Sequence, residues 1–230
     1  MKEAQDIPWK RIVVEATAIV ASILLAFAID AWWQDRTEQI VEAQYLHAMR
    51  EDLLSSIELL DESEASQRQQ VEFLESLLLT TADTPYSDEL RQWIDDGLFN
   101  IGTYLPRLSA FRDLESSGQT KIIRNQDIRR ALASVRQKMD GLETAQRDFQ
   151  KSQQSLIDPF LVDNFNLTDL MLDRPANGET DLSVLGSSDF QSRVAFKISL
   201  RREVSRAQDR VREAFNEALK LIEAELDTID

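Results

Sequence analysis

Residues 16–29 read ATAIVASILLAFAI, an apolar run of fourteen residues without a charged side chain. A helix over residues 12–33 spans roughly 30 Å at about 1.5 Å per residue, which matches the hydrocarbon core of a bilayer. Trp9 precedes this segment, and Trp32 and Trp33 close it, where indole rings prefer the headgroup level. The pattern predicts a transmembrane helix over residues 12–33 with these three tryptophans as interfacial anchors.

Two other interpretations fit the same run. A core helix of a soluble protein is one, because fourteen residues are fewer than a spanning segment usually has. A cleaved signal peptide is the other, because Lys10 and Arg11 precede the run and residues 26–28, Ala-Phe-Ala, resemble a cleavage site. Against cleavage, Glu15 stands where the apolar region should begin, and helical periodicity continues past Trp33 without a turn signal. A retained anchor is the preferred interpretation.

Basic residues set the expected topology. Lys2, Lys10 and Arg11 lie in a short tail, residues 1–11, and such residues are retained on the cytoplasmic side. We therefore expect a bacterial inner-membrane protein with a cytoplasmic N-terminus and a periplasmic domain over residues 34–230.

Two acids and three small residues recur along one side of the predicted anchor. They are Glu15, Ala18, Ser22, Ala26 and Asp30, and at about 100° per residue they project within roughly 120° of one another. Small residues let transmembrane helices approach closely, and acids in a membrane face protein or water. The spacing predicts a packing stripe for self-association. The alternative is that Asp30 is interfacial and Glu15 pairs with the basic residue one turn earlier.

Composition favours helices and excludes several classes of function. Only 6 Gly and 5 Pro occur in 230 residues, which is typical of long helices. The formal charge of −15 argues against nucleic acid as a partner, because Lys and Arg supply much of that affinity. The chain has no cysteine, which excludes disulfides and thiolate sites. We predict an all-α chain with one anchor and one extramembrane domain.

Apolar residues at spacings of three and four predict five helical segments beyond the anchor. The long segments cover about residues 34–80, 121–158 and 189–229, and the short ones about 87–100 and 107–117. The first continues from the anchor, but the polar stretch DESEASQRQQ at 61–70 interrupts its stripe and leaves its continuity open. Because each stripe needs a partner, we expect an elongated antiparallel bundle with coiled-coil character.

Local residues predict where these helices begin and end. Ser87 and Asp189 are expected N-caps, Gly118 is an expected helix terminator, and Asp158-Pro159 is expected to end the 121–158 helix. Residues 160–188, which include Pro175, Asn177, Gly178 and Gly186, are interpreted as an irregular connection with about one helical turn. A seven-residue interval within the 121–158 helix joins Ile128, Val135, Leu142, Phe149 and Leu156.

Two patterns resemble a broad group of uncharacterised bacterial membrane proteins. In residues 15–53, a Glu precedes an apolar helix that ends in Asp and a Trp pair. In residues 104–135, an aromatic residue and a Leu lead to Ser-Ser-Gly at 116–118 and then Ile-Ile-Arg-Asn at 122–125. Both patterns match in order and separation and cover about a third of the chain. The chain departs at residues 133–135, Ala-Ser-Val, where an aromatic pair is common. The resemblance implies a single-pass topology and no catalytic residues.

The sequence holds no recognisable catalytic or metal-binding motif. His47 is the only histidine, and phosphate-binding glycine loops and dinucleotide fingerprints are absent. Acidic clusters on the helices are interpreted as solvated faces. We therefore expect no enzyme, no cofactor and no metal.

One polar turn is a candidate for binding. It gathers two hydroxyls, a guanidinium and an amide at a helix junction, from Ser116, Ser117, Gly118, Arg124 and Asn125. The alternative is ordinary helix termination followed by a new cap.

These features predict a membrane-anchored, non-enzymatic scaffold or assembly protein. Its expected partners are the lipid bilayer and either further copies of itself or another envelope protein. A periplasmic ligand sensor that acts through a partner is one alternative. An accessory subunit of an ion-driven or transport complex, using Glu15 or Asp30, is the other.

Overall fold

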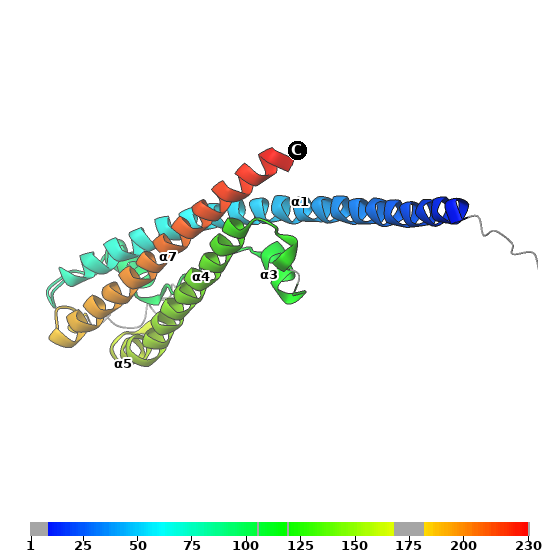
Figure 1. Cartoon of the computed structure of the whole chain (residues 1–230). Coiled ribbons are helices and arrows are strands. Elements are labelled where there is room, and N and C mark those ends of the chain that lie inside the picture. The colour runs from blue at the N-terminus through cyan, green and yellow to red at the C-terminus, as the bar shows by residue number, and fades with distance from the viewer. Residues whose placement is uncertain (1–8, 105, 119, 168–181, 230) are drawn as a thin grey trace, which may run out of the picture.

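The computed structural model describes residues 9–104, 106–118, 120–167 and 182–229, and this part of the chain is all-α with no strand, as predicted (Figure 1). A long apolar N-terminal helix is followed by further helices that pack against its second half. The elements in chain order are α1 (Trp9–Leu78), α2 (Asp88–Ile94), the π-helix η1 (Asp95–Phe99), α3 (Ser109–Ser116), the 3₁₀-helix η2 (Thr120–Ile122), α4 (Gln126–Ser152), the π-helix η3 (Gln153–Ile157), α5 (Asp158–Asn164) and α7 (Ser188–Ile229).

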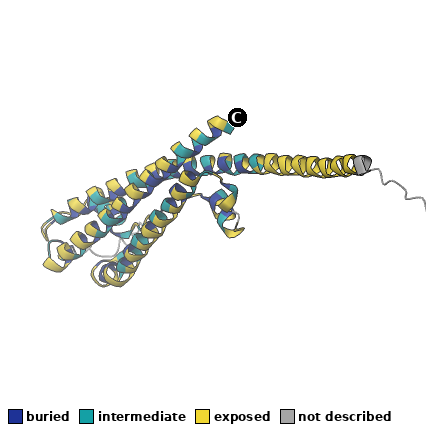
Figure 2. Ribbon diagram, in the orientation of Figure 1, coloured by how far each residue is buried: buried dark blue, intermediate teal, exposed yellow. Residues whose placement is uncertain are grey.

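Helix α1 is unbroken over 70 residues, or about 105 Å at a rise of ~1.5 Å per residue. It contains neither proline nor glycine, so no residue removes a backbone hydrogen bond or favours a kink. Residues 61–70, whose continuity the sequence left open, are helical throughout. Residues 13–38 are exposed and form the rod at the blue end of Figure 1, whereas the buried side of α1 begins at Glu42 (Figure 2).

Short elements connect α1 to α4. Ser87 caps α2, because its Oγ accepts a hydrogen bond from the Leu90 N–H at 3.1 Å. The short helix α3 ends at Ser116, and Gly118 follows with a φ of 69°. Glycine adopts this left-handed conformation without steric cost, so Gly118 terminates the helix where the sequence predicts.

The predicted helix end at Asp158-Pro159 is wrong. Helix α4 passes through η3 into α5, which ends at Asn164. Pro159 is tolerated because it lies in the first turn of α5, where its missing N–H is not needed. The wider π-turns of η3 also shift the phase of the helix. The seven-residue interval is therefore buried only as far as Phe149; Leu156 is 42% exposed and Ile157 is buried instead.

Helix α7 runs antiparallel to α1 and α4 and packs against both (Figure 1). Ser187, and not the predicted Asp189, caps it: the Phe190 N–H donates to Ser187 Oγ at 3.2 Å. Asp189 instead pairs with Arg193 in the first turn. The apolar stripe that its spacing predicts faces the bundle: Val204, Ala207, Val211, Ala214, Ala218 and Ile222 are buried, and Leu221 is half-buried.

The connection before α7 is only partly irregular, because α5 occupies its beginning. Pro175, Asn177 and Gly178, on which that prediction rested, lie outside the described residues. Residues 182–187 form a turn in which Gly186 has a φ of 79°.

Two apolar clusters fill the bundle, and a polar layer separates them. One cluster lies toward the exposed N-terminal part of α1 and includes Leu53, Leu142 and Val211, and the other lies toward the far end of the bundle and includes Leu74 and Phe190. The buried polar side chains near the boundary of the two clusters are Gln67, Gln70, Gln153, Lys197 and Arg201; Gln208 is also buried, among α7 residues of the first cluster. The polar stretch 61–70 therefore does not break α1, and two of its glutamines, Gln67 and Gln70, are buried inside the bundle.

Candidate functional site

The predicted packing stripe lies on the uncovered half of α1. Among the described helices, α1 is the one long and apolar enough to cross a membrane, and none of its most apolar 18-residue window, with mean hydropathy 2.1, is buried. Glu15, Ala18, Ser22, Ala26 and Asp30 are all exposed. The Ser22 Oγ donates to the Ala18 carbonyl oxygen at 2.7 Å, so this hydroxyl is satisfied within the helix. The predicted anchors Trp32 and Trp33 are exposed at the end of the apolar run, and Trp9 begins α1.

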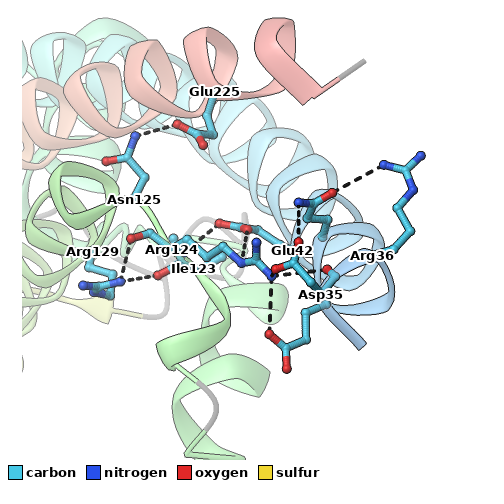
Figure 3. A network of polar contacts seen from close by, with 10 residues as sticks. Asp35, Arg36, Glu42, Ile123, Arg124, Asn125, Arg129 and Glu225 are labelled. Carbon is cyan, nitrogen blue, oxygen red and sulfur yellow. Dashed lines mark hydrogen bonds and ion pairs between the residues drawn. The ribbon is translucent and has the colours of Figure 1, made fainter. Parts of the chain in front are cut away.

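Arg124, from the predicted binding turn, attaches that turn to α1 (Figure 3). Its backbone N–H donates to Glu42 Oε1 at 2.7 Å. Its guanidinium lies 2.7 Å from the Asp35 carboxylate and 3.3 Å from that of Glu38. Glu42 is only 3% exposed, and a buried carboxylate of this kind requires partners. This backbone hydrogen bond and the guanidinium supply them.

Asn125 connects the start of α4 to the last turns of α7 (Figure 3). Its Oδ1 accepts from the Asp127 N–H at 2.9 Å and caps α4, while its Nδ2 donates to Glu225 at 2.6 Å. Arg129 donates to the carbonyl oxygens of Ile123 and Arg124 and closes the turn. The network therefore joins α1, α4 and α7 at the end of the bundle nearest the exposed part of α1.

The other half of the predicted binding turn lies apart from this network. Ser116 Oγ donates to the Asp113 carbonyl oxygen and Ser117 Oγ to that of Leu114, both at 3.1 Å, and all three residues 116–118 are exposed. These are bonds of a helix end. The geometry favours the alternative interpretation of this turn, helix termination followed by a new cap.

The polar layer holds two buried cations that the sequence interpretation missed. Lys197 and Arg201 are each 1% exposed and lie one turn apart on α7. The Lys197 ammonium donates to the Leu98 carbonyl oxygen and, at 2.8 Å, to Gln153 Oε1. The Arg201 guanidinium lies 3.9 Å from the centre of the Phe149 ring. No described carboxylate pairs with either cation.

Burial changes the acidity of both groups. Removal from water, followed by the charge of Arg201, lowers the pKa of Lys197 to about 7. Burial also lowers the pKa of Arg201 to about 10. The charge of Asp158 acts in the opposite direction and raises the pKa of Lys197; Asp158 Oδ1 accepts from Gln153 Nε2 at 2.6 Å. The polar layer therefore holds two basic side chains without a described carboxylate paired to either of them.

A signal for this layer was present in the sequence. Buried apolar positions of α7 at Phe190, Val194 and Val204 are spaced so that Lys197 and Arg201 fall in phase with them. Residue type alone points the other way, because Lys and Arg are almost never fully buried without a partner. The helical spacing of the apolar residues therefore predicts the burial of Lys197 and Arg201 better than residue type does.

No known family model, curated protein or solved structure matches this chain. The likeness to uncharacterised single-pass membrane proteins thus stays a prediction. Among the described residues, no cluster of His, Cys, Asp and Glu is arranged to hold a metal ion.

Proposed function

We propose that this protein is a single-pass membrane-anchored scaffold of the bacterial inner membrane, with residues 1–11 in the cytoplasm and the bundle in the periplasm. The observation that carries the proposal is the exposed apolar half of α1. A helix in water needs to bury its apolar residues, yet residues 13–33 are exposed around the whole circumference. A bilayer covers such a surface on all sides.

The same observation weighs against the two other interpretations of the apolar run. A core helix would be covered by the rest of the chain, and this segment is not. Cleavage after Ala28 would cut a helix that continues without a break to Leu78. A continuous helix instead carries the bundle on the anchor itself.

Self-association through the Glu15 to Asp30 stripe is the proposed means of assembly. The stripe offers small side chains at Ala18, Ser22 and Ala26 and places both acids where a neighbouring helix or water, and not lipid, would meet them. The likeness to the uncharacterised membrane family is consistent with this proposal.

Native mass spectrometry of the full-length protein in lipid particles, combined with protease accessibility, tests the proposal. We expect a discrete oligomer with a protected N-terminus, which Ala18→Leu, Ser22→Leu and Ala26→Leu together disrupt. The matched control is Thr17→Leu, Ala28→Leu and Ala31→Leu, which adds bulk to the opposite side of the helix and should leave the oligomer intact. Equal masses for the wild type and both triple variants would refute assembly through the stripe, and a missing N-terminal segment would refute the anchor.

A further inference from the structure

The bundle covers only one side of α1. The first four buried residues along this helix are Glu42, Leu46, Met49 and Leu53. At about 100° per residue, they project within roughly 40° of the direction opposite Trp33, whereas the stripe from Glu15 to Asp30 is centred on the direction of Trp33. The bundle and the stripe therefore lie on opposite sides of one continuous helix.

A row of exposed residues continues the stripe into the part of α1 that carries the bundle. This outer row has a seven-residue interval and consists of Ala26, Trp33, Ile40, His47 and Leu54. Trp33, Ile40 and Leu54 are 66%, 49% and 41% exposed. A seven-residue interval drifts by only about 20° per heptad on a straight helix, and a left-handed supercoil of two helices keeps it facing the partner. The outer row is thus spaced as the seam of a two-helix coiled coil.

The two edges of the outer row differ in charge. Arg36 and Arg50 flank the row on one edge, and Asp30 and Glu51 flank it on the other. In a parallel pair of identical helices, each edge faces the opposite edge of the partner, so the arginines of one copy meet the acids of the other. An antiparallel pair would place like charges together. Arg50 also pairs with Glu223, but its side chain keeps 42% of its surface exposed and so accessible to a second acid.

We propose that a second copy of this chain packs parallel against the outer row, so that two α1 helices form one seam from Ala26 to Leu54 with a bundle on each outer side. This inference rests on the scaffold proposal, in which both copies cross the bilayer in the same direction, and it names the residues through which they meet beyond the apolar run. Ile40 and Leu54 pack against the same residues of the partner and lose contact with water. Asp61, the next residue at this interval, is charged and pairs with Arg212 within its own chain, so the seam ends at Leu54.

Cysteine cross-linking of the full-length protein in lipid particles tests this inference, because the chain has no cysteine of its own. We expect Ile40→Cys and Leu54→Cys, each as a single variant, to form covalent dimers when oxidised with copper phenanthroline. Cross-linking at both positions requires a parallel pair in register, because an antiparallel pair brings only one position onto its own copy. The control is Ala133→Cys, at an exposed alanine of α4, which should stay monomeric on a denaturing gel.

A charge reversal tests the two edges. Glu51→Lys places a cation opposite the partner's Arg50 and should lower the fraction of Leu54→Cys protein that cross-links. Glu217→Lys, the same change at an exposed position of α7, should leave that fraction unchanged. Both substituted residues are exposed, so neither change removes a buried group. Equal cross-linking in the two charge variants would overturn the pairing of the edges.

Ser22→Cys, within the stripe, separates this inference from the scaffold proposal. Cross-linking at Ser22 without cross-linking at Ile40 and Leu54 would overturn the seam and leave assembly through the stripe standing. No cross-linking at any of the three positions would overturn both. Cross-linking of Ala133→Cys to the same extent as Leu54→Cys would also overturn the seam, because random collisions would then account for the dimers.

Discussion

The backbone N–H of Arg124 donates to the buried carboxylate of Glu42 across 2.7 Å and 82 residues of sequence. This bond fixes the start of α4 against α1 at the point where the exposed rod becomes part of the bundle. The guanidinium of the same arginine then reaches back along α1 to Asp35. One residue therefore holds the base of the bundle through both its backbone and its side chain.

Replacing Glu42 should destabilise the bundle. Glu42→Leu leaves the Arg124 N–H without its acceptor and should lower the free energy of unfolding by about 1–3 kcal/mol. Glu42→Gln keeps an acceptor oxygen and should lose less. Urea unfolding followed by circular dichroism measures both. The control is Glu38→Gln, at an exposed partner of Arg124, and a loss equal to that of Glu42→Leu would show that the buried hydrogen bond is not what matters.

Lys197 should make stability depend on pH. Its pKa is about 7 in the fold and 10.5 when unperturbed, so between these values the unfolded chain holds a proton that the folded chain has released. The free energy of unfolding should then rise with pH from about 7 upward, by at most ~1.4 kcal/mol per pH unit from this group, and its contribution should be flat below about 7. Lys197→Met should lack this slope. Parallel pH profiles of the two proteins in urea unfolding would contradict the assignment.

Because η3 shifts the phase of the helix, alanine substitutions at two neighbouring residues should differ strongly in their effect on stability. Ile157→Ala should cost about 2–5 kcal/mol, because Ile157 is 4% exposed and its removal leaves a cavity. Leu156→Ala should change stability by less than about 0.5 kcal/mol, because Leu156 lies at the surface. The seven-residue interval in the sequence predicts the reverse order. Thermal unfolding of the two variants shows whether Ile157, as in the structure, or Leu156, as the seven-residue interval predicts, is the buried residue.

Two glycines with positive φ should respond differently to alanine. At Gly186 an added Cβ would lie 3.0 Å from the Thr81 Cα, so Gly186→Ala combines backbone strain with a clash against another backbone segment. At Gly118 an added Cβ meets nothing within 4 Å, so Gly118→Ala should lose only about 1 kcal/mol. Gly186→Ala should lose more in the same unfolding experiment. Equal losses of stability would mean that the backbone at Thr81 shifts at little cost to accommodate the added Cβ.

The sequence predicted the helices and most of their faces because those depend on local spacing. The Ser87 cap, the Gly118 terminator and the α7 stripe all follow from a few neighbouring residues. The two errors near the end of the 121–158 segment both involve the π-helix η3. Pro159 is tolerated because it lies in the first turn of α5, directly after η3. The wider turn of η3 places Ile157, and not Leu156, in the buried position. Neither event leaves a local signature.

The candidate site was predicted less well. The turn with Arg124 and Asn125 was identified, but its role depends on Glu42 and Glu225, which lie 82 and 100 residues away in the sequence. The buried cations were missed because residue type was given more weight than phase. That Lys197 and Arg201 are buried can be concluded only once α1 and α4 are known to cover this side of α7.

Because α1 is continuous from Trp9 to Leu78, the number of residues between the apolar run and Glu42 sets the rotation of the bundle about the axis of α1, relative to the apolar run. One residue inserted within 31–34 would turn the bundle by about 100° while raising it by only ~1.5 Å, whereas seven would nearly restore the rotation and raise it by roughly 10 Å. The orientation of the bundle and its distance from the apolar run can thus be varied almost independently by the length of a single stretch of helix.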